Sequence, residues 1–185
     1  MRRLVLLSVV SVASLWLATG ALAAPPWEGA SAARLTLSDA EAAIILGDSA
    51  AVQAKVDAAR GAVEGVLAGR PADLAAARRL LDDAEAAAAR LDATALAGAR
   101  AAVWTTILHA SFERAVDAAR RGDLAQARSW LLVREFRPPT RFTRAAADGT
   151  LALERLAAGT MTPAAAATAV RRDLLDTYDG PRIPQ

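Results

Sequence analysis

The chain has 185 residues, of which 54% are hydrophobic and only 4% aromatic, and it contains no cysteine. The lack of cysteine excludes disulfides, thiol catalysis, cysteine metal sites and a lipid anchor on a cysteine, so stability depends on a core of Leu, Val and Ala. The formal charge of +2 comes from residues 1–23, which hold two arginines and no acid, and the rest carries 20 basic and 20 acidic residues. A neutral chain gives no reason to expect nucleic acid as a partner.

Residues 1–23 have the order of a secretory signal peptide. Arg2 and Arg3 precede an apolar run from Leu4 to Ala18, and Ala21-Leu22-Ala23 supplies the small residues of a cleavage site. Because spanning a bilayer takes roughly 20 apolar residues, we expect cleavage after Ala23, with an uncleaved anchor as the alternative. The sequence predicts an exported protein, in the periplasm or on the outer face of the cytoplasmic membrane. We expect it to meet the membrane only through its leader or a partner.

The next part of the chain predicts three helices. Ser38-Asp39-Ala40-Glu41 has the form of a capping box, which opens a helix that reaches Leu46. After Gly47-Asp48, Ser49 can cap a second helix, and Gly69-Arg70-Pro71 ends it. A third helix follows. Apolar residues spaced three and four apart mark one face of each of these two helices: Val52, Val56, Ala59, Val63 and Val66, then Leu74, Ala77, Leu81, Ala84, Ala88 and Leu91.

The second half continues in the same way. A longer helix begins at Asp92 or Thr94, and Gly122-Asp123 turns the chain into a helix that ends near Glu135. A short helix over residues 148–157 and a last one, capped by Thr162 and opened by Pro163, complete the pattern. No stretch alternates as a strand would. We therefore expect an all-α fold, an antiparallel bundle of about five or six helices over residues 24–178, with an irregular tail over 179–185.

Few side chains in this sequence could support catalysis. His109 is the only histidine, no serine stands in a nucleophile-elbow context, and no glycine-rich phosphate loop is present. We therefore expect that the protein is not an enzyme.

Metal binding is the stronger chemical candidate. His109, Glu113 and Asp117 stand four residues apart, so they line one side of a single helix, roughly opposite its Trp104–Leu108–Phe112 stripe. Imidazole with carboxylate suits iron, zinc or copper, although a straight helix offers at most two adjacent ligands and others must come from elsewhere. The alternative is an exposed polar face with no metal.

The segment from Trp130 to Phe142 is the most distinctive in the chain, because aromatic, basic and proline residues crowd together there. Pro138 and Pro139 cannot continue a helix. Two interpretations remain open. The segment could bind a partner with an acidic surface or lipid head groups, or it could close one end of the bundle through structural contacts. The candidate partner-binding residues are Trp130, Arg134, Glu135, Arg137, Arg141 and Phe142.

Three stretches resemble one known family: residues 130–142, Ala147–Glu154 and Asp173–Tyr178. They are similar to the extracytoplasmic N-terminal region of bacterial high-affinity iron permeases, the oxidase-dependent iron transporters. In that family a leader and a helical domain precede a polytopic permease domain. The resemblance implies an exported module of an iron-uptake system that captures or presents iron, or docks the membrane permease domain or another uptake component. The alternative is a structural or protein-interaction helical bundle with no metal role and no cofactor.

The chain also departs from that family. Transport there is associated with an Arg-Glu-x-x-Glu motif on membrane helices, and Arg134-Glu135-Phe136-Arg137-Pro138 lacks the second glutamate. After Tyr178 the sequence continues as Asp179-Gly180-Pro181 rather than toward a membrane part. A truncated product, a stand-alone relative and a cut domain all fit this ending. We expect that this sequence alone does not conduct iron across a membrane.

Overall fold

The computed structural model describes residues 26–132 and 141–178, with side chains placed for 28–132 and 148–172. Seven helices and no strand occupy these residues: α1 (Pro26–Ile45), α2 (Ser49–Val66), α3 (Pro71–Ala89), α4 (Ala93–Arg120), α5 (Leu124–Leu131), α6 (Arg141–Ala157) and α7 (Pro163–Tyr178). The all-α prediction is confirmed for the described residues, which contain seven helices rather than five or six. The proposed leader and tail lie outside them.

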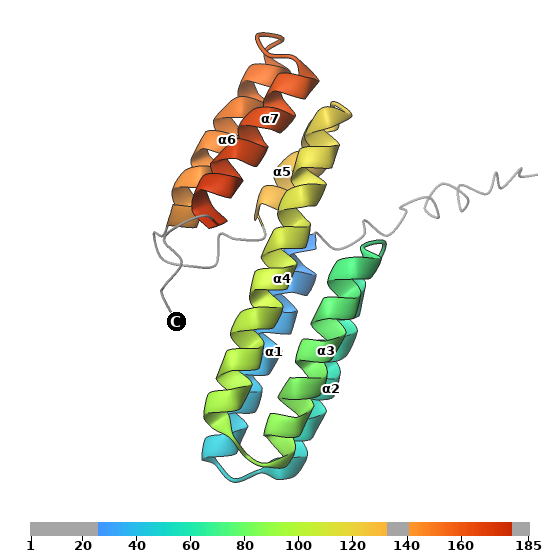
Figure 1. Cartoon of the computed structure of the whole chain (residues 1–185), viewed down its shortest axis with the longest axis vertical. Coiled ribbons are helices and arrows are strands. Elements are labelled where there is room, and N and C mark those ends of the chain that lie inside the picture. Colours follow the sequence, from blue (N-terminus) through green and yellow to red (C-terminus); the bar gives the residue numbers. More distant parts are fainter. Residues whose placement is uncertain (1–25, 133–140, 179–185) are drawn as a thin grey trace, which may run out of the picture.

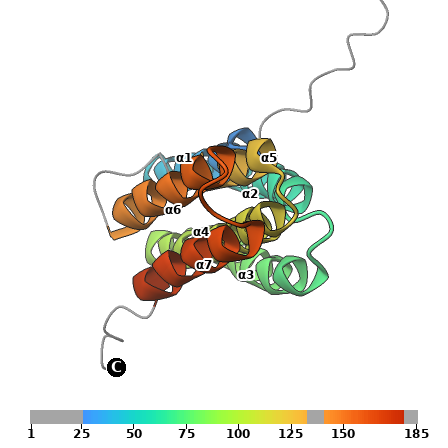
Figure 2. The same ribbon diagram turned by 90° about the horizontal axis from the view of Figure 1, so that it is seen from above.

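Helices α1 to α4 form the long body of the molecule and run alternately up and down (Figure 1). Each packs against the next, and α4 also packs against α1, so the four helices close around a shared core. A view down the long axis places α1 and α2 on one side and α3 and α4 on the other (Figure 2). None of the described helices combines the length and the apolar character needed to cross a membrane.

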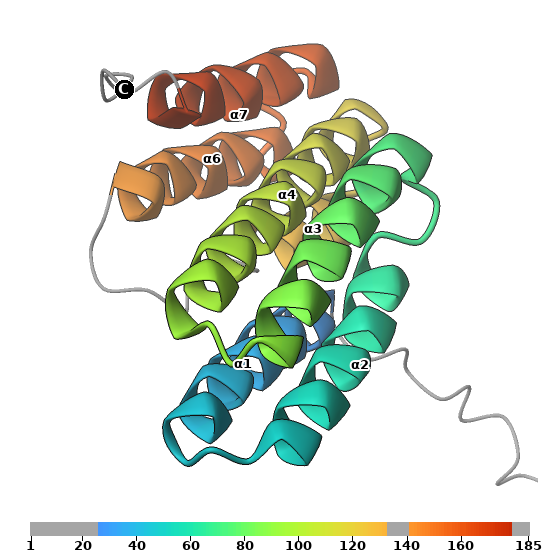
Figure 3. The ribbon, with the colours of Figure 1, turned by 60° about the horizontal axis from the view of Figure 1, so that its bottom comes forward.

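The last three helices cover one end of this body. Helix α5 packs against α4, and the α6–α7 hairpin packs on α4 and α5, away from the turns that join α1 to α2 and α3 to α4 (Figure 3). Arg171 of α7 pairs with Glu113 of α4 at 3.3 Å. Gly149 of α6 is buried beside Leu131 of α5 and Val170 of α7.

The core is built from small aliphatic side chains, as the low aromatic content predicted. The predicted stripe on α2 is buried along its whole length, and so is the Trp104–Val116 stripe on α4. On α3 the predicted face is buried at Ala77, Leu81, Ala84 and Ala88, while Leu91 is 38% exposed. Fully buried alanines, including Ala33 and Ala59, let neighbouring helices approach closely.

Aspartates begin three of the helices. Asp48, Asp92 and Asp123 accept hydrogen bonds from the backbone N–H groups of Ala51, Ala95 and Gln126 at 2.9, 2.9 and 3.0 Å. These bonds satisfy donors that have no partner inside the helix. The cap of α2 is therefore Asp48 rather than Ser49. The predicted cap of α7 is confirmed, since Thr162 Oγ1 accepts from Ala165 N at 3.2 Å.

The capping box at Ser38 was a wrong prediction. Helix α1 begins twelve residues earlier, with Pro26 as its first residue, a position where proline costs no hydrogen bond. Ser38 is an exposed residue in its middle. The two acidic residues of the apparent box bind other helices instead, Asp39 to Lys55 of α2 at 3.3 Å and Glu41 to Arg100 of α4.

Two other boundaries also differ from the predictions. Helix α6 begins at Arg141, seven residues before the predicted start at Asp148. Helix α5 ends at Leu131, whereas the sequence predicted an end near Glu135, which lies outside the described residues.

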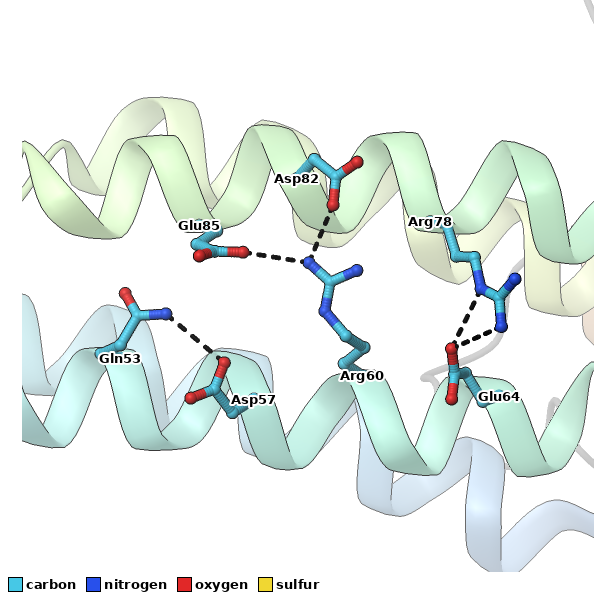
Figure 4. A network of polar contacts seen from close by, with 7 residues as sticks. All are labelled: Gln53, Asp57, Arg60, Glu64, Arg78, Asp82 and Glu85. Carbon is cyan, nitrogen blue, oxygen red and sulfur yellow. Dashed lines mark hydrogen bonds and ion pairs between the residues drawn. The ribbon is translucent and has the colours of Figure 1, made fainter.

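The outer faces of α2 and α3 are joined by exposed ion pairs (Figure 4). Arg60 bonds both Asp82 and Glu85, at 2.9 and 3.1 Å, and Arg78 bonds Glu64 at 2.8 Å. The hydrogen bond that Arg60 donates to Asp82, assisted by the charges of both carboxylates, raises the pKa of Arg60 against the opposing effect of burial. Exposed pairs of this kind add little to stability.

Candidate interaction site

Arg114 of α4 joins three helices at the end of the body that carries α5. Its Nη1 donates to the carbonyl of Val66, the last residue of α2, at 3.0 Å, and its Nη2 donates to the carbonyl of Ala68. The guanidinium also lies 4.5 Å from the ring centroid of Trp130 on α5. Because the last carbonyls of a helix have no partner within it, Arg114 caps α2 and holds α5 beside it.

The environment of Arg114 disfavours its positive charge. Burial lowers its pKa most, and the nearby cation of Arg70 lowers it further, while Asp73 acts in the opposite direction. An arginine keeps its proton even so. The interactions with the carbonyls and the Trp130 ring therefore have to offset the removal of this cation from water.

A second polar group stands next to it, where α3 begins. Arg70 Nε donates to Asp73 Oδ2 at 2.8 Å, and His109 Nδ1 lies 3.5 Å from Asp73 Oδ1. The Asp73 side chain is only 17% exposed. Asp73 thus links the α2–α3 turn to α4. Sequence reasoning identified His109 but not Asp73, because the two are brought together only by the packing of α3 on α4.

The predicted metal ligands each contact a different group. His109 lies beside Asp73, Glu113 pairs with Arg171, and Asp117 pairs with Arg120 at 3.1 Å. Within the described residues, no three His, Asp or Glu side chains come together in a way that could hold a metal ion. Metal binding by His109, Glu113 and Asp117 stays a prediction.

The predicted partner-binding residues are described only in part. Trp130 is half-buried at the end of α5, against Arg114. Arg134, Glu135 and Arg137 lie outside the described residues, while Arg141 and Phe142 form the start of α6 with side chains that the structure does not describe.

Sequence reasoning missed Arg114, the residue that connects Trp130 to the body. One signal for it was present, since it is the only lysine or arginine between Arg100 and Arg120, in a stretch that is otherwise mostly apolar. A lone cation in such a stretch indicates a specific partner, although the sequence does not say which one.

Comparison with known proteins identifies the family. No curated protein and no solved structure matches the chain. The model of the iron permease FTR1 N-terminal domain matches residues 23–181, which include all seven described helices. The family resemblance found in the sequence is thus confirmed, and the match covers most of the chain. The chain belongs to the iron permease FTR1 N-terminal domain family.

Proposed function

We propose that this chain is an exported, non-enzymatic module of an iron-uptake system, and that it docks another component of that system through the end that carries Trp130. The partner carries an acidic surface. Arg134, Arg137 and Arg141 follow Trp130 within eleven residues, and they are the cations that would meet that surface. Family membership supports the role in iron uptake.

The observation that carries this proposal is the attachment of Trp130. Its ring is held by Arg114, which is itself bonded to the end of α2. The arginine-rich segment therefore leaves the body from a fixed point rather than from a loosely packed helix end. A fixed base lowers the ordering cost that a docking segment incurs when it binds.

Iron uptake in cells tests this role. We expect that deleting the gene lowers uptake of radiolabelled iron at limiting supply, and that wild-type protein restores it. A chain with Arg137→Gln and Arg141→Gln should restore little uptake although its abundance and melting temperature match wild type. The matched control replaces two exposed arginines outside this segment, Arg79 of α3 and Arg155 of α6, with glutamine, and should restore uptake fully.

The results that contradict the proposal are specific. Unchanged uptake after deletion would remove the role in iron import. Full uptake with the Arg137/Arg141 variant would remove the docking role of these arginines. A large fall of its melting temperature would show that the two arginines close the end of the bundle through structural contacts instead.

Iron capture on α4 is the second candidate function, and the neighbouring Asp73 favours it. This carboxylate brings an oxygen ligand from α3 close to the imidazole of His109. Carboxylate oxygen and imidazole nitrogen are both ligands of iron. Calorimetry with ferrous and ferric iron on the chain from Ala24 tests it. Binding that His109→Ala with Glu113→Ala abolishes would support capture, and binding no tighter than millimolar would exclude it.

A further inference from the structure

The end of the body opposite α5–α7 carries an apolar tip, formed by Ile45, Leu46 and Leu91. Ile45 ends α1, Leu46 follows it in the α1–α2 turn, and Leu91 lies in the α3–α4 turn. Both turns lie at the same end of the body (Figures 1 and 3). Ile45 and Leu46 are each 82% exposed, so these aliphatic side chains project into water with little packing to account for them.

Leu91 stands where three similar turns have glycine. In the turns after α1, α4 and α6, the second residue past the helix end is Gly47, Gly122 or Gly159, with φ between 69° and 76°. The N–H of this glycine donates to the carbonyl three residues before it, and the N–H of the following residue donates to the carbonyl five residues before that residue. Leu91 makes the same two bonds at φ 53° and is the only described non-glycine residue with positive φ. A leucine there is strained, and strain of this kind often marks a functional position.

We propose that the apolar tip inserts into the surface of a lipid bilayer. Three aliphatic side chains at the end of a rod are too few to cover the roughly 800 Å² per partner that a stable protein interface buries. Shallow insertion has no such requirement, since each apolar side chain contributes separately as it leaves water. Membership in a permease family places a bilayer near the protein.

The charges at the tip agree with a lipid surface of no net charge. Asp48 and Asp92 both accept backbone hydrogen bonds at helix N-termini, where the helix dipole stabilises their charge. Arg90, exposed in the α3–α4 turn, is the cation beside them. Because this set is not basic overall, binding should depend on apolar contact and change little with salt.

The tip also orients the molecule. Helix α4 has 28 residues and is therefore about 42 Å long at 1.5 Å per residue. With the tip at the bilayer and α4 upright, Trp130, which stacks on Arg114 about three quarters of the way along α4, would stand roughly 30 Å from the lipid surface. The partner docked there would then be an extracytoplasmic component rather than a part embedded in the membrane. The inference about the partner rests on the docking proposed above, whereas the proposed insertion of the tip does not.

A fluorescent label at the tip tests insertion directly. The chain from Ala24 contains every described helix and has no cysteine, so a single introduced cysteine takes one environment-sensitive dye. We expect that dye at Leu46→Cys shifts to the blue on adding phosphatidylcholine vesicles. Dye at Ala125→Cys, on the exposed face of α5, should not shift. High salt should leave the shift unchanged.

Side-chain removal provides the second measurement. Ile45→Ser with Leu46→Ser should reduce partitioning into the same vesicles by about tenfold or more, since each aliphatic side chain adds at least a few-fold. Leu91→Gly, which gives this turn the residue found in the others, should also reduce it. The matched control is Leu35→Ser, which removes a 53% exposed leucine from the same helix ten residues before the tip, and should change partitioning less than twofold.

Thermal unfolding followed by circular dichroism is the control for folding. Equal melting temperatures show that the variants fold as the wild type does, so their partitioning can be compared. No blue shift at millimolar lipid would overturn the proposal. So would unchanged partitioning of the double variant, or a concentration-dependent dimer that loses its contact in the double variant. None of these results bears on docking at Trp130, which the iron-uptake assay measures separately.

Discussion

The guanidinium of Arg114 lies over the ring of Trp130 at 4.5 Å and at the same time bonds the carbonyls that end α2. One side chain from α4 thus fixes the end of α2 and the position of α5. The segment with the candidate docking residues follows α5 directly. Arg114 therefore contributes to the stability of both elements at this end of the molecule.

We expect Arg114→Ala to lower the free energy of unfolding by about 2–4 kcal/mol, because it leaves two carbonyls without their charged donor and removes the contact with the ring. For a chain of this size, that corresponds to a fall in melting temperature of roughly 5–15 °C. Arg114→Lys keeps the charge but not the forked geometry, so it should recover only part of the loss.

Trp130→Leu separates the two roles of Arg114. It keeps an apolar side chain on α5 while removing the aromatic ring, so its cost should be smaller than that of Arg114→Ala. In a double-mutant cycle measured by urea denaturation, the two substitutions should show a coupling of about 0.5–1 kcal/mol. Additive effects would mean that the stacked ring contributes nothing beyond its packing.

The two aspartate caps and the apparent capping box at Ser38 predict opposite outcomes. Asp48→Ala and Asp92→Ala each remove a hydrogen bond to a helix N-terminus and should each cost about 1 kcal/mol. Ser38→Ala should be neutral or slightly stabilising, because Ser38 is exposed inside α1 and alanine favours a helix. A loss at Ser38 as large as that at Asp48 would mean that a helix does begin there.

These caps also show why some of the fold could be predicted from the sequence and some could not. The stripes on α2 and α4 hold valine, leucine and aromatic residues, which stand out as a period against polar neighbours. The buried face of α1 includes Ala30, Ala33 and Ala40. Because alanine is also common on exposed helix faces, the start of this helix showed no periodic pattern of apolar residues. The local capping pattern at Ser38 was then misleading.

The candidate site was less predictable still. Trp130 could be singled out by its type and neighbours. The partners of Arg114 are backbone carbonyls, which have no sequence signature, and they lie 46 and 48 residues before it. Asp73 and His109 meet only after α3 packs on α4. Such contacts are a result of tertiary structure, and no local pattern encodes them.

Two ion pairs on α1 should differ in their contribution to stability. Glu41 and Arg100 are 21% and 25% exposed, whereas Asp39 and Lys55 are 60% and 45% exposed. Glu41→Gln should cost about 1–3 kcal/mol, because it leaves a half-buried arginine without its counter-ion. Asp39→Asn should cost less than about 0.5 kcal/mol. Thermal unfolding at low and high salt checks both, and only the Asp39 effect should disappear at high salt.

The glycines provide a last prediction, since their environments differ. Gly61 and Gly98 lie inside α2 and α4, with open space where a side chain would begin. Alanine at either position should stabilise the protein by about 0.5–1 kcal/mol, because glycine has the greater entropy to lose in a helix. Gly149→Ala should also be tolerated, as its new carbon would lie at ordinary contact distance, 3.5 Å, from Leu131.

We expect Gly29→Ala and Gly47→Ala, in contrast, to destabilise the protein. A side chain at Gly29 would stand 2.8 Å from Val66 Cγ2, so the buried Val66 side chain or the helix that carries it would have to shift. At Gly47, where space is free, the φ of 71° itself disfavours alanine by about 1 kcal/mol. Chemical denaturation of the five variants distinguishes these causes. A stabilised Gly47→Ala variant would show that the α1–α2 turn adopts another conformation, and the positions of Ile45 and Leu46 at the tip would change with it.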